Sequence, residues 1–320
     1  MEISDCLRRQ IESDLGLNVW LERGQDIPVR NCWHFSTDGK AVEVLFFDKD
    51  DYRDAMNRLF IMARRYGVVI LAFVLMDTHV HFILYGTESE CSRAVHDFVK
   101  RTSMSISARH GLRHQLFQLP VHRQSVDTLS YLRKAICYVL RNPLVAGICS
   151  NYYDYPWSSG ALMFREAGLW TAARWMTESR VNLMSLTDAS RREILKSRDI
   201  HHDVSVDSDG LVFPGEYVAT GIAERVFRTG KSFFFTMCST RESDIETLSG
   251  SLSHLSIPIA EMRQHRNELC RDLFNRPDAR SLCMADRIRL ARALRSRYGS
   301  SPRQIARVCG LIYSEVKDLL

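Results

Sequence analysis

The sequence predicts an α+β fold over its first half and a mostly helical region toward its C-terminal end. In the first half, apolar runs of strand length alternate with segments in which apolar residues recur every three or four positions. The first pattern is typical of β-strands and the second of amphipathic helices. Near the C-terminal end, apolar residues at helical spacing stand among many arginines, which indicates a second, helical module.

Turn residues mark the limits of the expected elements in residues 25–165, which we interpret as one compact domain after a leader helix over residues 1–24. Short apolar runs bounded by Gly, Asp or Asn predict strands. The strands are expected at 27–36, 42–47, 68–76 and 79–85. Helices are expected after residues 48–51, over 88–110 and over 129–140, and the Asn142-Pro143 step is expected to end the last of them.

Residues 166–260 carry weaker patterns, so their fold stays open. Thr187 is expected to cap a helix through Leu195, and residues 207–210 to form a turn. The serine-rich stretch 249–256 is a candidate linker to the last region.

Residues 261–320 are expected to form a helical DNA-binding region. Leu290, Ala291 and Leu294 give one helix an apolar stripe. Ser301-Pro302 then has the features of a new helix start, and Gly310 separates it from a last short helix. Helix, glycine turn and helix predict a helix-turn-helix motif, with a plain helical hairpin as the alternative.

Composition places the chain among ordinary globular proteins, with 45% hydrophobic and 25% charged residues in 320. No apolar run approaches the length of about 18 residues that a membrane span needs. The first ten residues lack the apolar core of a secretory signal. The 9 cysteines are scattered singly, which favours reduced thiols, mostly in cores, and a cytoplasmic location.

Positive charge is concentrated in two segments of the chain. Residues 90–150 hold nine Lys or Arg against three Asp or Glu, and residues 262–320 hold thirteen against six. The formal net charge of the whole chain is only +5, so the remaining residues are acidic in sum. Two basic segments on an otherwise acidic chain favour nucleic-acid binding, and solvated helix faces are the alternative.

His79 and His81 form an H-x-H pair on an expected strand, where residues two apart point to the same face. Two imidazoles on one face can share a divalent metal ion, which polarises a phosphate and stabilises a leaving oxygen. The spacing alone is a weak signal, because core histidines at this spacing are common.

Three segments resemble the REP-associated tyrosine transposases, single-tyrosine members of the HUH nuclease group. Residues 76–84 (MDTHVHFIL) are similar to the family's M-P-N-H-x-H segment. Residues 138–148 (YVLRNPLVAGI) are similar to its Y-I-x-x-N-P-V-x-A-G-L segment, and residues 155–159 (YPWSS) to its Y-x-W-S-S. Their order and spacing also match, over about half of the chain.

The resemblance implies an RRM-like antiparallel sheet with helices and a metal ion, Mg²⁺ or Mn²⁺, held by His79 and His81. It also implies a tyrosine, on a helix after the H-x-H strand, that attacks DNA and forms a phosphotyrosine link. The implied substrate is single-stranded DNA with a nearby hairpin.

The chain departs from this pattern on the helix at 88–110, which contains no tyrosine. Aligning Lys100-Arg101 with the family's basic pair places Ser103 where we expect the tyrosine and Ser107 where a third metal ligand often lies. A serine side chain is shorter than tyrosine, and its hydroxyl has a much higher pKa than the tyrosine phenol. In addition, Thr78 replaces the usual asparagine before the first histidine. Family-type strand transfer is therefore not expected unless Tyr131, Tyr138 or another tyrosine enters the site.

Basic, aromatic and polar residues of both basic segments are the expected DNA contacts, through phosphates, stacking and base edges. They are Lys100, Arg101, Arg109, Arg113, Arg123, Arg141, Arg303, Tyr313, Ser314 and Lys317. Each arginine alone is more often a solvated surface residue, and Asn142-Pro143 and Trp157-Ser158-Ser159 suit structural roles at least as well.

Three functions stay open at this point. The first is a protein that binds single-stranded or hairpin DNA without family-type strand transfer. The second is an active metal-dependent DNA nickase or transposase. The third is a regulator that binds duplex DNA through the expected helix-turn-helix. The sequence does not decide whether the chain forms a homodimer.

Overall fold

The computed structural model describes residues 3–19, 26–37, 44–111, 120–164, 179–240, 259–298 and 302–316. Its centre is a four-stranded antiparallel sheet in the order β2-β3-β1-β4. The strands are β1 (Cys32–Thr37), β2 (Val69–Leu75), β3 (Val80–Tyr85) and β4 (Val121–Ser125). With one helix after β1 and one after β3, the chain runs β-α-β-β-α-β, and the expected RRM-like α+β class is confirmed.

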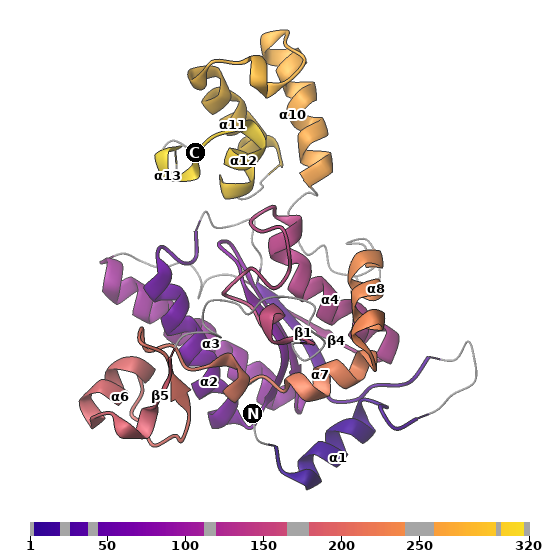
Figure 1. Ribbon diagram of the computed structural model, residues 1–320, viewed down its shortest axis with the longest axis vertical. Coiled ribbons are helices and arrows are strands. Elements are labelled where there is room, and N and C mark those ends of the chain that lie inside the picture. Colours follow the sequence, from indigo (N-terminus) through magenta and orange to yellow (C-terminus); the bar gives the residue numbers. More distant parts are fainter. Residues whose placement is uncertain are drawn as a thin grey trace.

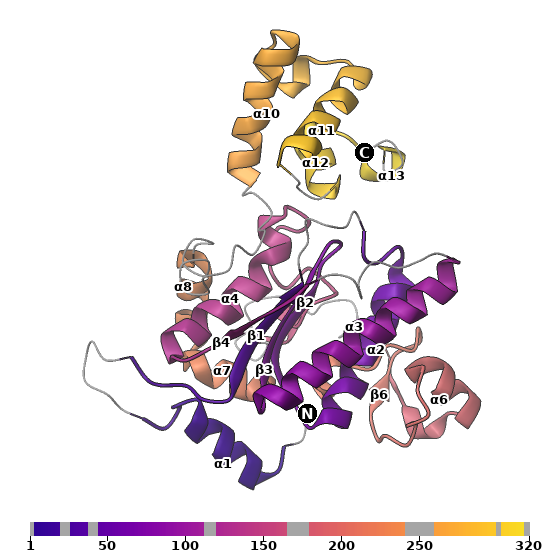
Figure 2. The same cartoon turned by 180° about the vertical axis from the view of Figure 1, so that it is seen from behind.

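Helices cover both faces of this sheet (Figures 1 and 2). On one face lie α2 (Lys49–Tyr66) and α3 (Glu88–His110). On the other lie α4 (Leu129–Val145), α7 (Thr220–Phe227) and α8 (Gly230–Ser239). Alternate residues of each strand therefore enter two separate cores: Phe82 packs toward α2 and α3, and Ile83 toward α4.

Local signals set the ends of the first helices. Asp48 caps α2, with its carboxylate accepting a hydrogen bond from the Asp51 N–H at 2.9 Å, and Gly67 ends α2 with a φ of 66°. Thr87 and Glu90 form a capping box at the start of α3. The helix expected over 88–110 is confirmed residue for residue.

Two expectations about this domain are wrong. Residues 44–47, the described part of the strand expected at 42–47, form no strand: Leu45 is fully buried as a loop residue and donates its N–H to the Asp77 carbonyl at 2.6 Å. In addition, α4 does not stop at residue 140 but continues through Pro143. Proline removes only its own N–H, and the helix is still closed by the bond from the Ala146 N–H to the Asn142 carbonyl at 2.9 Å.

The segment at 155–159 has a structural role along β2. Tyr155 donates its hydroxyl to the Leu75 carbonyl at 2.7 Å, and Ser159 donates its N–H to the Phe73 carbonyl at 3.0 Å. Both Ser158 and Ser159 are fully buried. This segment extends the pairing of β2 beyond the four strands, which explains its tight combination of aromatic and small residues.

Residues 179–240, the described part of the region whose fold the sequence left open, pack against the same two cores. Thr187 caps α6 (Asp188–Leu195), as expected, and the turn at 207–210 is also present. Leu195 joins the core of α2 and α3, whereas Phe233 joins that of α4. The remaining elements outside the C-terminal helices are α1 (Asp5–Asp14), η2 (Gly160–Leu162), β5 (Val181–Asn182), η4 (Leu183–Ser185), β6 (Ser205–Val206) and η5 (Pro214–Glu216).

The C-terminal helices surround a third hydrophobic core that contains the expected stripe of Leu290, Ala291 and Leu294, each fully buried. The elements are α10 (Ile259–Phe274), η6 (Ala279–Ser281), α11 (Met284–Tyr298), α12 (Pro302–Cys309) and α13 (Tyr313–Val316). Gly310 takes a φ of 69° in the turn between α12 and α13.

No helix in the described part of the chain is long and apolar enough to cross a membrane. All nine cysteines are free thiols and five of them are buried, which agrees with the expected core positions.

Candidate functional site

The two histidines of the H-x-H pair point toward α4. His81 lies in β3 and shares its face with Ile83 and Tyr85, which belong to the core of α4. His79 directly precedes the strand. Their exposed fractions are 4% for His79 and 2% for His81, so both rings sit inside the protein.

Helix α4 brings a tyrosine and an asparagine to this pair. Tyr138 and Asn142 are four residues apart and so lie on one face of α4. The Tyr138 ring meets the His81 ring edge-on, with centroids 5.3 Å apart, and Asn142 Oδ1 lies 3.1 Å from His79 Nε2. As expected, α3 carries no tyrosine. Tyr138, one of the tyrosines that the sequence left open as an entrant, meets the pair from α4.

Hydrogen bonds around His79 fix its tautomer. Asn142 Nδ2 donates to the Tyr138 carbonyl at 3.0 Å, which turns Asn142 Oδ1 toward His79. Since Oδ1 only accepts, His79 Nε2 carries the proton, and Nδ1 accepts from the Thr78 hydroxyl at 2.9 Å. Thr78, the departure from the family's asparagine, thus orients the first histidine of the pair.

A third histidine, His34 from β1, completes the cluster. His34 Nε2 and His81 Nδ1 lie 3.1 Å apart, and the two rings stack with centroids 5.3 Å apart. His81 Nε2 is buried and has no hydrogen-bond partner among the described residues. When His81 Nδ1 donates to His34, its Nε2 presents a lone pair to the site, so His34 is placed to orient a ligand atom.

Burial keeps these rings neutral. It lowers the pKa of His34 to about 4, and it lowers the pKa of His81 well below the usual range, with the nearby His79 and His34 adding to the effect. Neutral imidazole is the form that binds metal ions.

We expect the metal-free protein to lose stability in mild acid. The folded pKa of His34 is below its unfolded value of 6.5, so the unfolded chain takes up the proton first. The stability is fully present above about pH 6.5 and is lost as the pH falls toward 4. The titration of His34 alone should lower the free energy of unfolding by about 2 kcal/mol between about pH 7.5 and pH 5. Urea titrations with a chelator at several pH values measure this.

The matched variants for the acid test are His34→Gln, which removes the buried titrating ring, and His122→Gln, which removes an exposed ring on β4. His34→Gln should reduce the slope of the unfolding free energy against pH, which reports the protons taken up on unfolding, by up to about one proton. His122→Gln should leave this slope unchanged. Equal curves for all three proteins would show that His34 is not the titrating group.

The serines that the sequence placed in the site lie elsewhere. Ser103 and Ser107 are on α3, which packs on the opposite face of the sheet from His81 and α4. The structure therefore does not bring Ser103 or Ser107 to the histidine pair. The sheet itself separates them, because α3 and α4 cover opposite faces.

Among the described residues, three ligand atoms close enough to share a metal ion are found at Asp48, Asp51 and His110, where they lie within 4.8 Å of one another. Arg109 already neutralises it, with Nη1 3.4 Å from Asp51 Oδ1 and 4.0 Å from Asp48 Oδ1. His110 Nε2 lies 2.9 Å from Asp51 Oδ2. These contacts account for the acidic cluster as an ion-pair network between α2 and α3.

Several of the expected DNA-contacting cations have protein partners. Arg101 pairs with Asp97 at 2.6 Å, Arg109 with Asp50 at 2.5 Å and Arg123 with Glu88 at 2.5 Å. Arg141 donates to the Thr240 carbonyl, whereas Lys100 is exposed in a hollow beside Arg58 and Lys196. Tyr313 is half-buried. Arg113 and Lys317 lie outside the described residues, and only the backbone is described at Arg303 and Ser314.

The sequence did contain a signal for the second half of the site. Tyr138 and Asn142 stand at helical i, i+4 spacing inside one of the segments that carries the family resemblance. Ending the helix before Asn142 concealed this relation, and searching for the tyrosine on the nearer helix led to Ser103.

Comparisons with known proteins found little. No protein-family model matches the chain, and no curated protein matches it. A solved structure described as a REP-associated tyrosine transposase bound to a REP hairpin aligns with a TM-score of 0.32 and 17% identity, over 48% of this chain and 89% of the other. Agreement at this level is too loose to assign a function.

Proposed function

We propose that the chain cleaves single-stranded DNA by transesterification, with Tyr138 as the nucleophile. The observation that carries this proposal is the meeting of His79, His81, Tyr138 and Asn142 from two separate elements in one buried cluster. A pair of histidines and a phenol are the metal ligands and the nucleophile that the motif resemblance implies, and the Asn142 amide oxygen adds a further ligand atom.

The reaction would exchange one phosphate ester for another. The phenolic oxygen of Tyr138 attacks the phosphorus, a P–O bond to the 3′ oxygen breaks, and a 5′-phosphotyrosine link forms. The phenol loses one proton and the departing 3′ oxygen gains one, so the step is balanced without an oxidant or a cofactor-derived group. Reversal by another 3′-hydroxyl rejoins a strand.

The residues present fit a divalent metal ion. Buried His81 Nε2 lacks a hydrogen-bond partner among the described residues, and His79 Nε2 faces the amide oxygen of Asn142. His79, His81 and Asn142 would hold the ion once the proton of the neutral His79 ring moves from Nε2 to Nδ1, where the Thr78 hydroxyl oxygen can accept it. When bound, such an ion polarises the scissile phosphate.

Access to the nucleophile sets a condition on this activity. Tyr138 is 4% exposed and Asn142 6%, so a DNA strand reaches the phenol only after the cluster is uncovered. We therefore expect cleavage to be slower than DNA binding, with the opening of the site as a separate step.

A covalent-adduct assay tests the proposal. The protein is incubated with a pool of single-stranded hairpin DNAs and Mn²⁺ or Mg²⁺, and DNA that stays attached under denaturing conditions is measured and mapped by mass spectrometry. We expect a phosphotyrosine at Tyr138 that requires the metal ion and is lost in the His79→Ala, His81→Ala double variant. Tight metal-independent binding of hairpins with no adduct would instead favour a DNA-binding protein that does not cut.

A further inference from the structure

Five arginines from four elements line one hollow of about 430 Å³ among the C-terminal helices. They come from α10, η6, α11 and α12, and among the described lining residues Asp278 is the one that carries a carboxylate. The five are Arg263, Arg266, Arg280, Arg287 and Arg307. We refer to this site as the arginine hollow.

The positive charge of the arginine hollow is not neutralised by the protein. None of its five guanidinium groups forms an ion pair with a carboxylate in the described part of the chain. Asp278 instead caps η6, accepting hydrogen bonds from the Arg280 and Ser281 N–H groups at 2.8 and 3.3 Å. Like charges gathered in this way repel one another, so an anion that enters the hollow is stabilised.

Backbone carbonyls fix two of these arginines in place. Arg266 Nη1 donates to the Val308 carbonyl at 2.9 Å, and Arg287 donates to the carbonyls of Leu282 and Arg280, both at 3.1 Å. Carbonyl partners orient a guanidinium without cancelling its charge. The entropy of ordering these side chains is therefore already lost before a ligand arrives.

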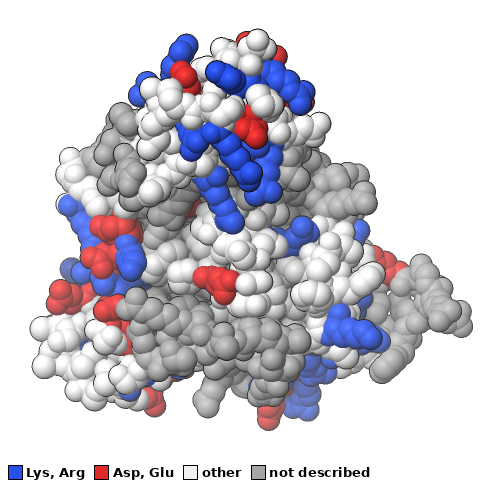
Figure 3. Space-filling view, turned by 45° about the horizontal axis from the view of Figure 1, so that its top comes forward, with Lys and Arg blue, Asp and Glu red and all other residues white. Residues whose placement is uncertain are grey.

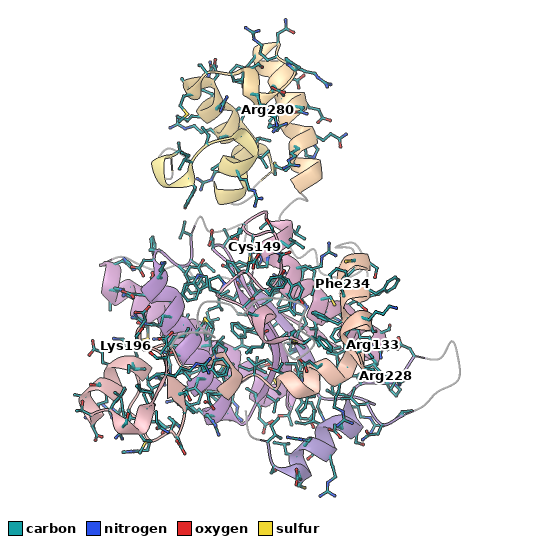
Figure 4. The ribbon with its side chains drawn as sticks, in the orientation of Figure 1. Arg133, Cys149, Lys196, Arg228, Phe234 and Arg280 are labelled. Atoms are coloured by element: carbon teal, nitrogen blue, oxygen red, sulfur yellow. The ribbon has the colours of Figure 1, made fainter. Side chains whose placement is uncertain are left out.

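Arg307 links the hollow to the proposed catalytic region. It donates to the carbonyl of Gly147, in the loop that follows α4, the helix that carries Tyr138 and Asn142. Figure 4 places Arg280 among the C-terminal helices and Cys149, two residues after Gly147, at the end of the sheet domain nearest to them. Figure 3 shows Lys and Arg side chains gathered over this part of the molecule.

We propose that the arginine hollow binds backbone phosphates of the nucleic-acid strand whose cleavage is proposed for Tyr138. Guanidinium groups bind phosphate oxygens in bidentate fashion, and several in one hollow suit consecutive phosphates of a flexible strand. The choice of a nucleic acid over a free phosphate ion rests on the proposed function. The contact contributes affinity and position but no base specificity.

The test compares two double variants of the full chain by fluorescence anisotropy with a labelled single-stranded hairpin across a salt titration. Arg263→Ala, Arg280→Ala removes two exposed guanidinium groups that have no hydrogen-bond or ion-pair partner among the described residues. Arg271→Ala, Arg276→Ala removes the same charge from exposed positions outside the hollow. We expect the first pair to weaken binding about tenfold or more and to reduce the slope of log K against log salt by about 1.4.

The control pair should lose less than about threefold in affinity with little change in slope. Equal losses for both pairs would overturn the proposal, because diffuse charge would then explain the binding. Thermal unfolding with millimolar orthophosphate or pyrophosphate supplies the second arm: stabilisation that the Arg263, Arg280 pair abolishes, with hairpin affinity unchanged, would identify a free phosphate ligand and also overturn it. Adduct formation at saturating DNA, which should survive in both pairs, reports separately on the proposed function.

Discussion

Replacing Tyr138 by Phe should reduce covalent DNA adduct by about a thousandfold or more, because the variant lacks the oxygen that attacks phosphorus. The phenyl ring still fills the space against His81 and His34, whose ring centroids lie 5.3 and 5.8 Å from that of Tyr138. Folding and DNA affinity should therefore stay close to those of the natural chain. Quantified gel assays under denaturing conditions, beside anisotropy with the same hairpin, measure both quantities.

Tyr131→Phe is the matched control for this result. Tyr131 is also buried on α4, at 5% exposure, and burial raises the pKa of its phenol to about 12. It lies near the start of the helix, where Thr128 caps it, whereas Asn142 and the histidine pair lie near its end. Adduct formation should survive in Tyr131→Phe. If Tyr131→Phe lost the adduct while Tyr138→Phe kept it, the nucleophile would be Tyr131, and the proposal for Tyr138 would be overturned.

Asn57→Ala should destabilise the fold by roughly 3 kcal/mol or more, since it leaves three backbone groups, two of them in buried hydrogen bonds, without partners. Asn57 is 1% exposed on α2 and joins that helix to the region after residue 179. Its amide donates to the carbonyls of Ile194 at 3.1 Å and Gly210 at 2.8 Å, and its oxygen accepts from the Val212 N–H at 2.8 Å. Urea unfolding gives the loss directly.

Asn151→Ala provides the same substitution at an exposed position, where the side chain only reaches Asp154 at 2.8 Å. That variant should lose less than about 0.5 kcal/mol. Limited proteolysis adds a local test, because release of residues 179–212 from α2 should expose them to cleavage in Asn57→Ala first. A loss below about 1 kcal/mol at Asn57 would mean that water replaces these hydrogen bonds at little cost.

Elements with a strong local signal could be predicted from the sequence alone. The continuous apolar run of β2, the helix α3 over residues 88–110 and the Thr187 cap of α6 depend on local patterns, so they appear where expected. Strand β4 carried no such signal. It is a polar, largely exposed edge strand, and it exists because β1 offers it a partner.

The candidate site, too, was predicted from the sequence only where the signal is local. By itself, the sequence determined the H-x-H pair and its common face, because residues two apart on a strand point the same way whatever surrounds them. It also determined the two basic segments and the four-residue spacing of Tyr138 and Asn142. Only the tertiary structure decided which helix faces the pair. Both α3 and α4 follow β3 in the chain, but they cover opposite faces of the sheet, so Ser103 is excluded from the cluster and Tyr138 is brought into it.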